Sequence, residues 1–187
     1  MKPHFKCFVI PSCMISDKKP IALMVKHSFK VHVWGAISVK GKIGMHIFTE
    51  NLDCHLYCQI LNEHLYDNAS AMHSNQWVFQ QDNDLKHTSH DVQDDLKTNL
   101  PGRVFAWPSY SPDLNPIENV WAILKKNVEK KVKSMMTQKK KISKDIFLNL
   151  IREEWDDIVN IVIVNCINSM PSHIKACIDA EGGHTKY

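Results

Sequence analysis

The chain has 187 residues, of which 44% are hydrophobic, and a formal net charge of +3. A chain of this length and composition can bury one sizeable core, so we expect a single globular domain. The excess of Lys and Arg over Asp and Glu, 23 against 20, is too small to indicate a polyanionic partner and only permits one.

The cysteines and the apolar segments argue against two further classes of protein. Six cysteines are scattered without C-x-x-C spacing and no signal peptide precedes them, which favours reduced thiols over a disulfide framework. The most apolar stretch, IVNIVIVNCI at residues 158–167, is far shorter than the roughly 20 residues that cross a bilayer. We therefore expect no transmembrane segment.

The first part of the chain predicts a hairpin and a helix. Residues 29–38 alternate valines with His32 and Trp34, and the turn VKGKIG leads to a second short run, GMHIF. From Asp53, which is a good N-cap, apolar residues recur at spacings of three and four and predict an amphipathic helix.

Alternating elements continue downstream. WVFQQ at 77–81 predicts a short strand, Thr88 or Ser89 can cap a second helix, and RVFAW at 103–107 predicts another strand. The order of elements up to this point is therefore β-β-α-β-α-β.

A long amphipathic helix is predicted next. Asn115 is a good N-cap, and Pro116 occupies the first helical position, where its missing N–H costs nothing. Glu118 lies at the edge of the apolar stripe in the first turn, so its carboxylate can face the end of the sheet. A charged break at 139–144 precedes a last helical region.

Two carboxylates are predicted to meet at one edge of the sheet. Asp82 directly follows the strand at 77–81, and Glu118 begins a helix next to the strand at 103–107. Open α/β folds place their sites at the carboxyl edge, and paired carboxylates suit Mg²⁺ or Mn²⁺. The pair indicates phosphoryl transfer, in which two ions activate a water or a 3′-hydroxyl and stabilise the leaving oxygen.

Each of these residues also has a purely structural interpretation. Glu118 stands three residues after Asn115 and can be the return arm of a capping box. Asp82 and Asp84 can be turn residues that end a strand, and Asp84 is the rival ligand on the same strand face. His87 is interpreted as a helix-start or hydrogen-bonding residue and not as a catalytic one.

Other residues raise the possibilities of zinc binding and nucleic-acid binding. Cys54, His55 and Cys58 share one helical turn, but without a second ligand pair their spacing does not favour zinc. Lys86 and the basic stretch at 124–144 are either contacts to a phosphate backbone or solvated side chains.

Three motifs carry a resemblance to a known family. KVHVWGAIS, WVFQQDNDLKHTS and WPSYSPDLNPIENVW, together with the ending SMPSHIKACIDAEGGHTKY, resemble the catalytic domain of Tc/mariner superfamily transposases over roughly residues 26–187. The resemblance implies an α/β fold of the ribonuclease H-like type, with a mixed sheet flanked by helices. It also implies a DDE/D triad of carboxylates.

The resemblance has consequences for site and partners. Asp82 corresponds to the second carboxylate of the triad and Glu118 to the third, so both are expected to be catalytic and to bind the metal, Mg²⁺ or Mn²⁺. The implied activity is cut-and-paste DNA transposition, that is, phosphodiester hydrolysis, strand transfer and DNA integration. DNA is the implied partner, the nucleus the implied location, and a homodimer a possible assembly.

The chain departs from the family pattern in three ways. Thirty-five residues separate Asp82 from Glu118, one more than is usual in the Tc branch, and Leu85 stands where the family has proline. The first aspartate of the triad has no clear counterpart: Asp17 is the single acidic residue among the first 30, and a Lys-Lys-Pro sequence follows it.

We therefore expect a divergent N-terminal segment at 1–25, an incomplete catalytic domain at 26–187 with a helical part at 133–187, and no helices that recognise transposon ends. The central strand is expected to be missing unless HFKCFVI at 4–10, which alternates in polarity, replaces it. Such a copy is expected to be an impaired transposase. The alternative is a non-catalytic remnant or a co-opted nucleic-acid-binding protein.

Overall fold

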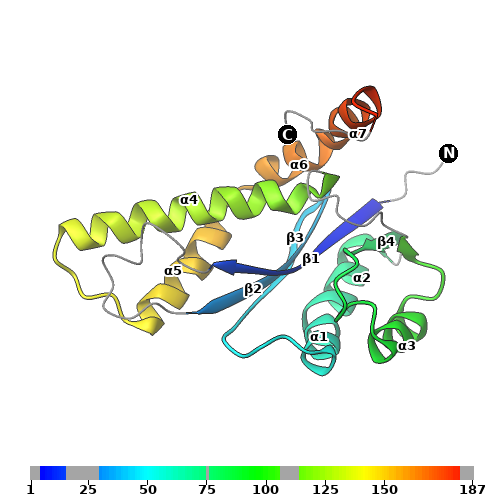
Figure 1. Ribbon diagram of the computed structural model, residues 1–187, viewed down its shortest axis with the longest axis horizontal. Coiled ribbons are helices and arrows are strands. Elements are labelled where there is room, and N and C mark those ends of the chain that lie inside the picture. Colours follow the sequence, from blue (N-terminus) through cyan, green and yellow to red (C-terminus); the bar gives the residue numbers. More distant parts are fainter. Residues whose placement is uncertain (1–4, 16–29, 75, 106–113, 182–187) are drawn as a thin grey trace.

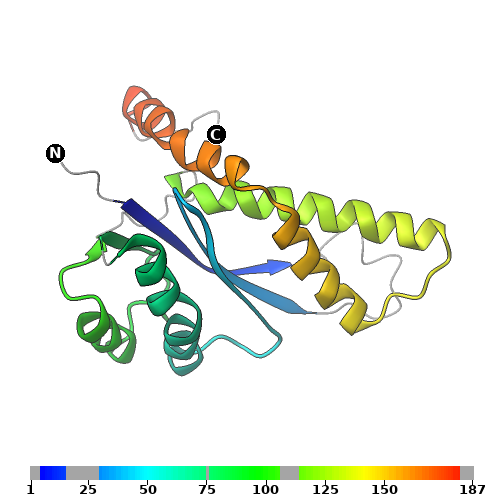
Figure 2. The same ribbon diagram turned by 180° about the vertical axis from the view of Figure 1, so that it is seen from behind.

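A computed structural model describes residues 5–15, 30–74, 76–105 and 114–181, and for residues 5–15 it describes the backbone alone. One sheet of five strands, in the order β3-β2-β1-β4-β5, lies between two groups of helices (Figures 1 and 2). The strands are β1 (Phe5–Ile15), β2 (Val31–Ser38), β3 (Gly41–Phe48), β4 (Trp77–Gln80) and β5 (Val104–Phe105). The helices are α1 (Cys54–Leu61), α2 (Asp67–His73), α3 (His90–Asn99), α4 (Pro116–Thr137), α5 (Lys144–Asp157), α6 (Asn160–Asn168) and α7 (Met170–Asp179), with a π-helical turn η2 (Asn62–Tyr66) joining α1 to α2.

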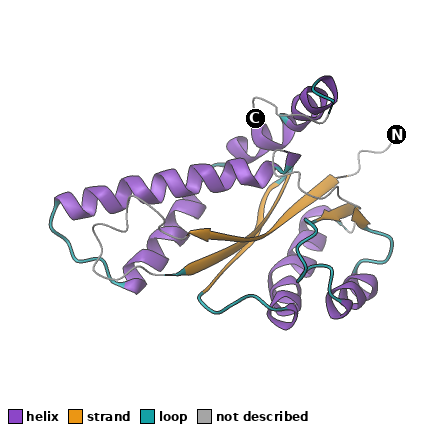
Figure 3. Ribbon diagram, in the orientation of Figure 1, coloured by secondary structure: helices purple, strands orange, loops and turns teal. Residues whose placement is uncertain are grey.

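The centre of the sheet is β1, which pairs antiparallel with β2 and parallel with β4. The expectation of a missing central strand is wrong, and its stated exception holds: the segment 5–10 of the predicted HFKCFVI stretch lies in β1, which continues to Ile15. The mixed α/β fold with helices on both faces is confirmed as well (Figure 3). The predicted boundary at residue 26 marks where the resemblance to the family begins. It stays a prediction, and it is not a boundary of the sheet, because β1 lies before it.

The predicted hairpin forms from β2 and β3, but all eight residues of β2 are buried. The reason is that the two faces of this strand enter two different cores. Trp34 and Ala36 belong to the core beneath α1, α2 and α3, whereas Val33 and Ile37 belong to the core beneath α4, α5 and α6. A strand that is covered on both faces has no polar side, whatever its sequence alternation.

The helices on the first face begin where the sequence predicts. The Asp53 side chain accepts a hydrogen bond from the Leu56 N–H at 2.8 Å and caps α1. Ser89 is the N-cap residue of α3, although its side chain makes no capping hydrogen bond. Helices α1 and α3 both contact the loop that follows β4.

The opposite face is covered by α4, which begins at Pro116 after Asn115 as predicted. Its predicted apolar stripe is buried, and the Trp121 ring packs against that of Trp155 in α5, with ring centroids 5.3 Å apart. The long axis of α4 therefore lies along the sheet, with its first turn near the end of β4 and its last turn far beyond it (Figure 1).

Helix α6 packs against β2 and β3, and α7 follows it at the end of the described chain (Figure 1). Within the described part of the chain, Asn160–Asp179 has the length and the mean hydropathy, 1.2, of a membrane-crossing segment. This measure alone is weak evidence, because apolar helices of many other proteins pass it. The expectation of no transmembrane segment stays a prediction.

Candidate active site

Asp82 lies two residues after the end of β4, at the edge of the sheet where parallel strands end. The preceding residue, Gln81, is buried, and its side chain connects two elements: its Oε1 accepts from the Tyr57 hydroxyl at 2.7 Å, and its Nε2 donates to the His87 carbonyl at 3.2 Å. Gln93 of α3 donates to the same carbonyl at 2.9 Å. The loop that carries Asp82 is thus tied to both α1 and α3.

The Asp82 carboxylate is held by its own loop. Its Oδ1 accepts hydrogen bonds from the ring of His87, with Nδ1 at 2.7 Å, and from the Asp84 N–H at 3.2 Å. A carboxylate can only accept, so Nδ1 of His87 carries the proton. The His87 side chain is fully buried and its ring lies 4.2 Å from that of Tyr57, centroid to centroid, while the Asp82 side chain is 44% exposed.

The interpretation of His87 as a hydrogen-bonding residue agrees with this geometry. Burial and the negative charge of Asp82 raise the pKa of Tyr57 well above its usual value, so its hydroxyl stays protonated and donates to Gln81. From the sequence, Tyr57 is one of the apolar residues of the predicted helix after Asp53, and Gln81 has no assigned role. The hydrogen bond between them could have been anticipated only from the rule that buried polar groups need partners.

Glu118 lies in the first turn of α4, on the exposed side of the helix. Partial removal from water raises the pKa of its carboxyl, and the negative charge of Asp82 raises it further. The charge of Asp82 thus acts on Glu118, although 35 residues separate the two acids in the chain. Their joint role in a metal site stays a prediction.

The competing interpretations of these acids receive less support. The side chain of Asn115 makes no hydrogen bond to the first turn of α4, so this arm of a capping box is not formed. Asp84 is engaged by Lys86, whose N–H donates to Oδ1 at 2.9 Å and whose ammonium lies 3.5 Å from Oδ2. Although desolvation opposes it, these contacts lower the pKa of Asp84, which acts as a turn residue.

Leu85, which replaces the usual proline, projects from the same turn and is 87% exposed. No packing depends on this position, so the replacement leaves the loop intact.

The strand next to β4 does not supply a third carboxylate. β1 runs parallel to β4, and their pairing ends with Phe8 beside Gln80. If this register is extended by two residues past the end of the pairing, residue 10 corresponds to Asp82. Residue 10 is isoleucine, and none of the residues of β1 is acidic. Asp17, the one acid near this end of the chain, lies outside the described residues.

Comparisons with known proteins agree with the fold and the motifs. A family model described as DDE superfamily endonuclease matches residues 11–143. The transposase of transposable element Tcb1 from Caenorhabditis briggsae is 37% identical over 164 residues, which is 87% of this chain and 57% of that protein. This chain thus spans little more than half the length of that relative.

Solved structures show the same architecture. The Mos1 transposase catalytic domain, in a structure with raltegravir and Mn, superposes with a TM-score of 0.71 at 17% identity, covering 98% of this chain and 86% of that one. A Mos1 transposase paired-end complex with the left transposon end gives a TM-score of 0.75 at 18% identity, over 98% of this chain and 57% of that one. At such identities these matches establish the fold. Together with the family model, they show that this chain belongs to the DDE superfamily endonucleases, in the Tc/mariner group of transposases.

Proposed function

We propose that this chain supplies the catalytic domain of a DNA transposase in which Asp82 and Glu118 hold Mg²⁺ or Mn²⁺. The observation that carries the proposal is the environment of Glu118: partial burial and, after it, the negative charge of Asp82 raise the pKa of its carboxyl. Catalytic sites gather like charges in this way, whereas surface acids usually lie apart. The Mos1 catalytic domain with Mn is a structural parallel for such a cation.

The donor atoms fit a hard divalent cation. Carboxylate oxygens are the ligands that Mg²⁺ and Mn²⁺ prefer, and a cation between Asp82 and Glu118 would offset the repulsion that the two charges now exert. Such an ion would supply polarisation of a phosphodiester and a more acidic bound water. The contribution of the chain is to hold Asp82 in place through the hydrogen bond from His87 and to present Glu118 from a rigid helix.

We further propose that this copy is catalytically impaired. Two carboxylates offer too few anionic ligands to hold two ions in register, and β1, the strand beside β4, carries no acidic residue. A non-catalytic domain that still contacts DNA is the second candidate function, and the same feature favours it.

DNA is the proposed partner, and the nucleus the proposed location. The similar Mos1 complex contains a transposon end, and on this chain the lysine-rich stretch at 124–144 is the feature that suits a phosphate backbone. Most of its lysines are exposed on α4 and the following turn, although Lys131 is neutralised by Glu154 and Asp157 of α5. Contacts to phosphates through such lysines are independent of base sequence.

Binding of Mn²⁺ to the purified chain, followed by calorimetry, tests the metal site. We expect Asp82→Asn and Glu118→Gln each to weaken binding at least about tenfold. Asp94→Asn is the matched control, because Asp94 is an exposed acid of α3 that pairs with Lys97. Affinity that is unchanged in both site variants would refute the assignment.

Strand cleavage of plasmid DNA with Mn²⁺ separates the two candidate functions. We expect little cleavage by the natural chain and a gain in Ile10→Asp, with Val9→Asp, one residue away from the level of Asp82, as the control. Robust cleavage by the natural chain that Asp82→Asn abolishes would overturn the impairment. DNA retention without cleavage, even in Ile10→Asp, would favour the non-catalytic function.

A further inference from the structure

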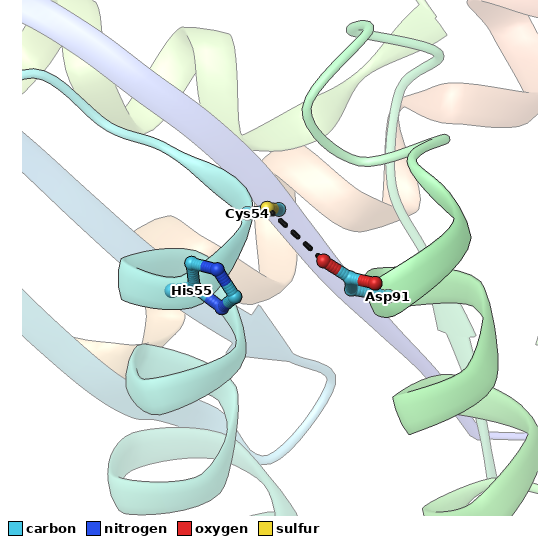
Figure 4. Close-up of side chains that lie close together, drawn as sticks. All are labelled: Cys54, His55 and Asp91. Carbon is cyan, nitrogen blue, oxygen red and sulfur yellow. Dashed lines mark hydrogen bonds between the residues drawn. The ribbon is translucent and has the colours of Figure 1, made fainter.

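A second group of metal-ligand side chains lies away from the carboxylate pair, between α1 and α3. Cys54 and His55 begin α1, and Asp91 is in the first turn of α3 (Figure 4). One donor atom from each of these residues lies within 4.8 Å of the other two. The sequence did not suggest this group, because Asp91 is 37 residues from Cys54 and the fold alone brings it close.

The separation of two of the donors, Cys54 and Asp91, fits a tetrahedral site. Cys54 Sγ lies 3.5 Å from Asp91 Oδ2 and donates a hydrogen bond to it. Bond lengths of about 2.3 Å for Zn–S and about 2.0 Å for Zn–O, at the tetrahedral angle, put sulfur and oxygen roughly 3.5 Å apart. The sulfur and the oxygen therefore already have the separation that a shared zinc ion requires. His55 is exposed, so its ring can turn toward the same point.

The two helices that carry the donors are fixed to each other by other contacts. Asp95, one turn after Asp91, accepts a hydrogen bond from Asn62 at 3.2 Å and a short one from the Tyr66 hydroxyl. Both donors belong to the π-helical turn that continues α1. The separation of Cys54 from Asp91 is thus set by the fold, so an ion would meet a preorganised pair.

The donor types select a different ion from that of the carboxylate pair. A thiolate, an imidazole and a carboxylate suit Zn²⁺, whereas Mg²⁺ and Mn²⁺ favour oxygen alone. Cys54 and Asp91 both lie in the first turns of their helices, so the two donors face the same end of the helix pair. Binding would release the thiol proton of Cys54 to solvent, and a water would complete the coordination.

We propose that Cys54, His55 and Asp91 form a zinc site that bridges α1 and α3, independent of the proposed transposase chemistry. The bridge would join the helices on either side of the loop at 82–89. It would stabilise that loop without any contact to the reacting atoms.

Cobalt substitution of the full chain tests this site. Under a reductant that is not a thiol, we expect one equivalent of Co²⁺ to give thiolate-to-cobalt charge-transfer absorption, which Zn²⁺ displaces and excess Mg²⁺ does not. Cys54→Ser should abolish this absorption, and Asp91→Asn should weaken Co²⁺ binding at least about tenfold. Asp91 is exposed, so its variant leaves the fold intact.

Cys58→Ser is the matched control, since Cys58 lies one turn further along α1 and burial raises the pKa of its thiol to about 11. The control should bind Co²⁺ as the natural chain does. A weakening in Cys58→Ser as large as in Cys54→Ser, or absorption that survives Cys54→Ser, would overturn the assignment. Binding of Co²⁺ without thiolate absorption would identify an adventitious surface ion and also reject the site.

Discussion

The contact between His87 and Asp82 gives a sharp test of how the candidate site is held. His87→Phe keeps a ring against Tyr57 and removes the hydrogen bond to Asp82. A hydrogen bond to a charged group contributes about 1.5–3 kcal/mol. Because the Asp82 side chain is 44% exposed, water compensates part of the loss, and we expect a decrease of about 1.5 kcal/mol in the free energy of unfolding.

His87→Ala removes the buried ring as well. The His87 side chain is fully buried, so the cavity adds a further loss, and we expect about 3 kcal/mol in total. Urea unfolding followed by circular dichroism measures both values, provided that the slope with denaturant is unchanged. For a chain of this size, the decrease for His87→Phe corresponds to a fall in Tm of roughly 3–6 °C.

His90→Ala is the control for these variants. His90 lies three residues further on, its side chain is 88% exposed, and it pairs with Asp94 at the surface. We expect its effect to stay within about 0.5 kcal/mol. If His87→Phe lowers stability no more than His90→Ala does, the hydrogen bond does not hold Asp82 and the reasoning is refuted.

Three further predictions concern charge and packing. Burial and, after it, the charge of Asp82 raise the pKa of the Glu118 carboxyl, so the free energy of unfolding decreases as pH rises through that pKa. Glu118→Gln should therefore add roughly 0.5 kcal/mol of stability at pH 7 and nothing below pH 4, and an equal effect at both pH values in urea unfolding would contradict the raised pKa. Gly44→Ala would put a methyl group 2.4 Å from the His64 carbonyl oxygen and should cost about 1–3 kcal/mol; an unchanged Tm would show that β3 and η2 do not pack closely. Leu124→Ala opens a cavity beneath α4 and should cost about 2–5 kcal/mol in urea unfolding, whereas a loss below 1 kcal/mol would mean that the side chain is not in the core.

The sequence by itself determined the local structure and the candidate acids. Asp53, Asn115 and Pro116 mark helix starts because caps and proline act on the backbone within one turn. Hydrophobic periodicity likewise fixed the stripe of α4, since a helix repeats its face at a constant spacing. The motifs around Asp82 and Glu118 single out these two carboxylates without any tertiary information.

The tertiary structure decided the strand order, the burial of β2 and the contacts between distant residues, none of which a local sequence pattern contains. It put β1 between β2 and β4, and it covered β2 on both faces despite the alternation in its sequence. It also joined Asp91 to Cys54 and brought the charge of Asp82 close enough to act on Glu118. These relations arise from packing between distant segments, and a local sequence pattern reports backbone preference and periodicity but not distance through space.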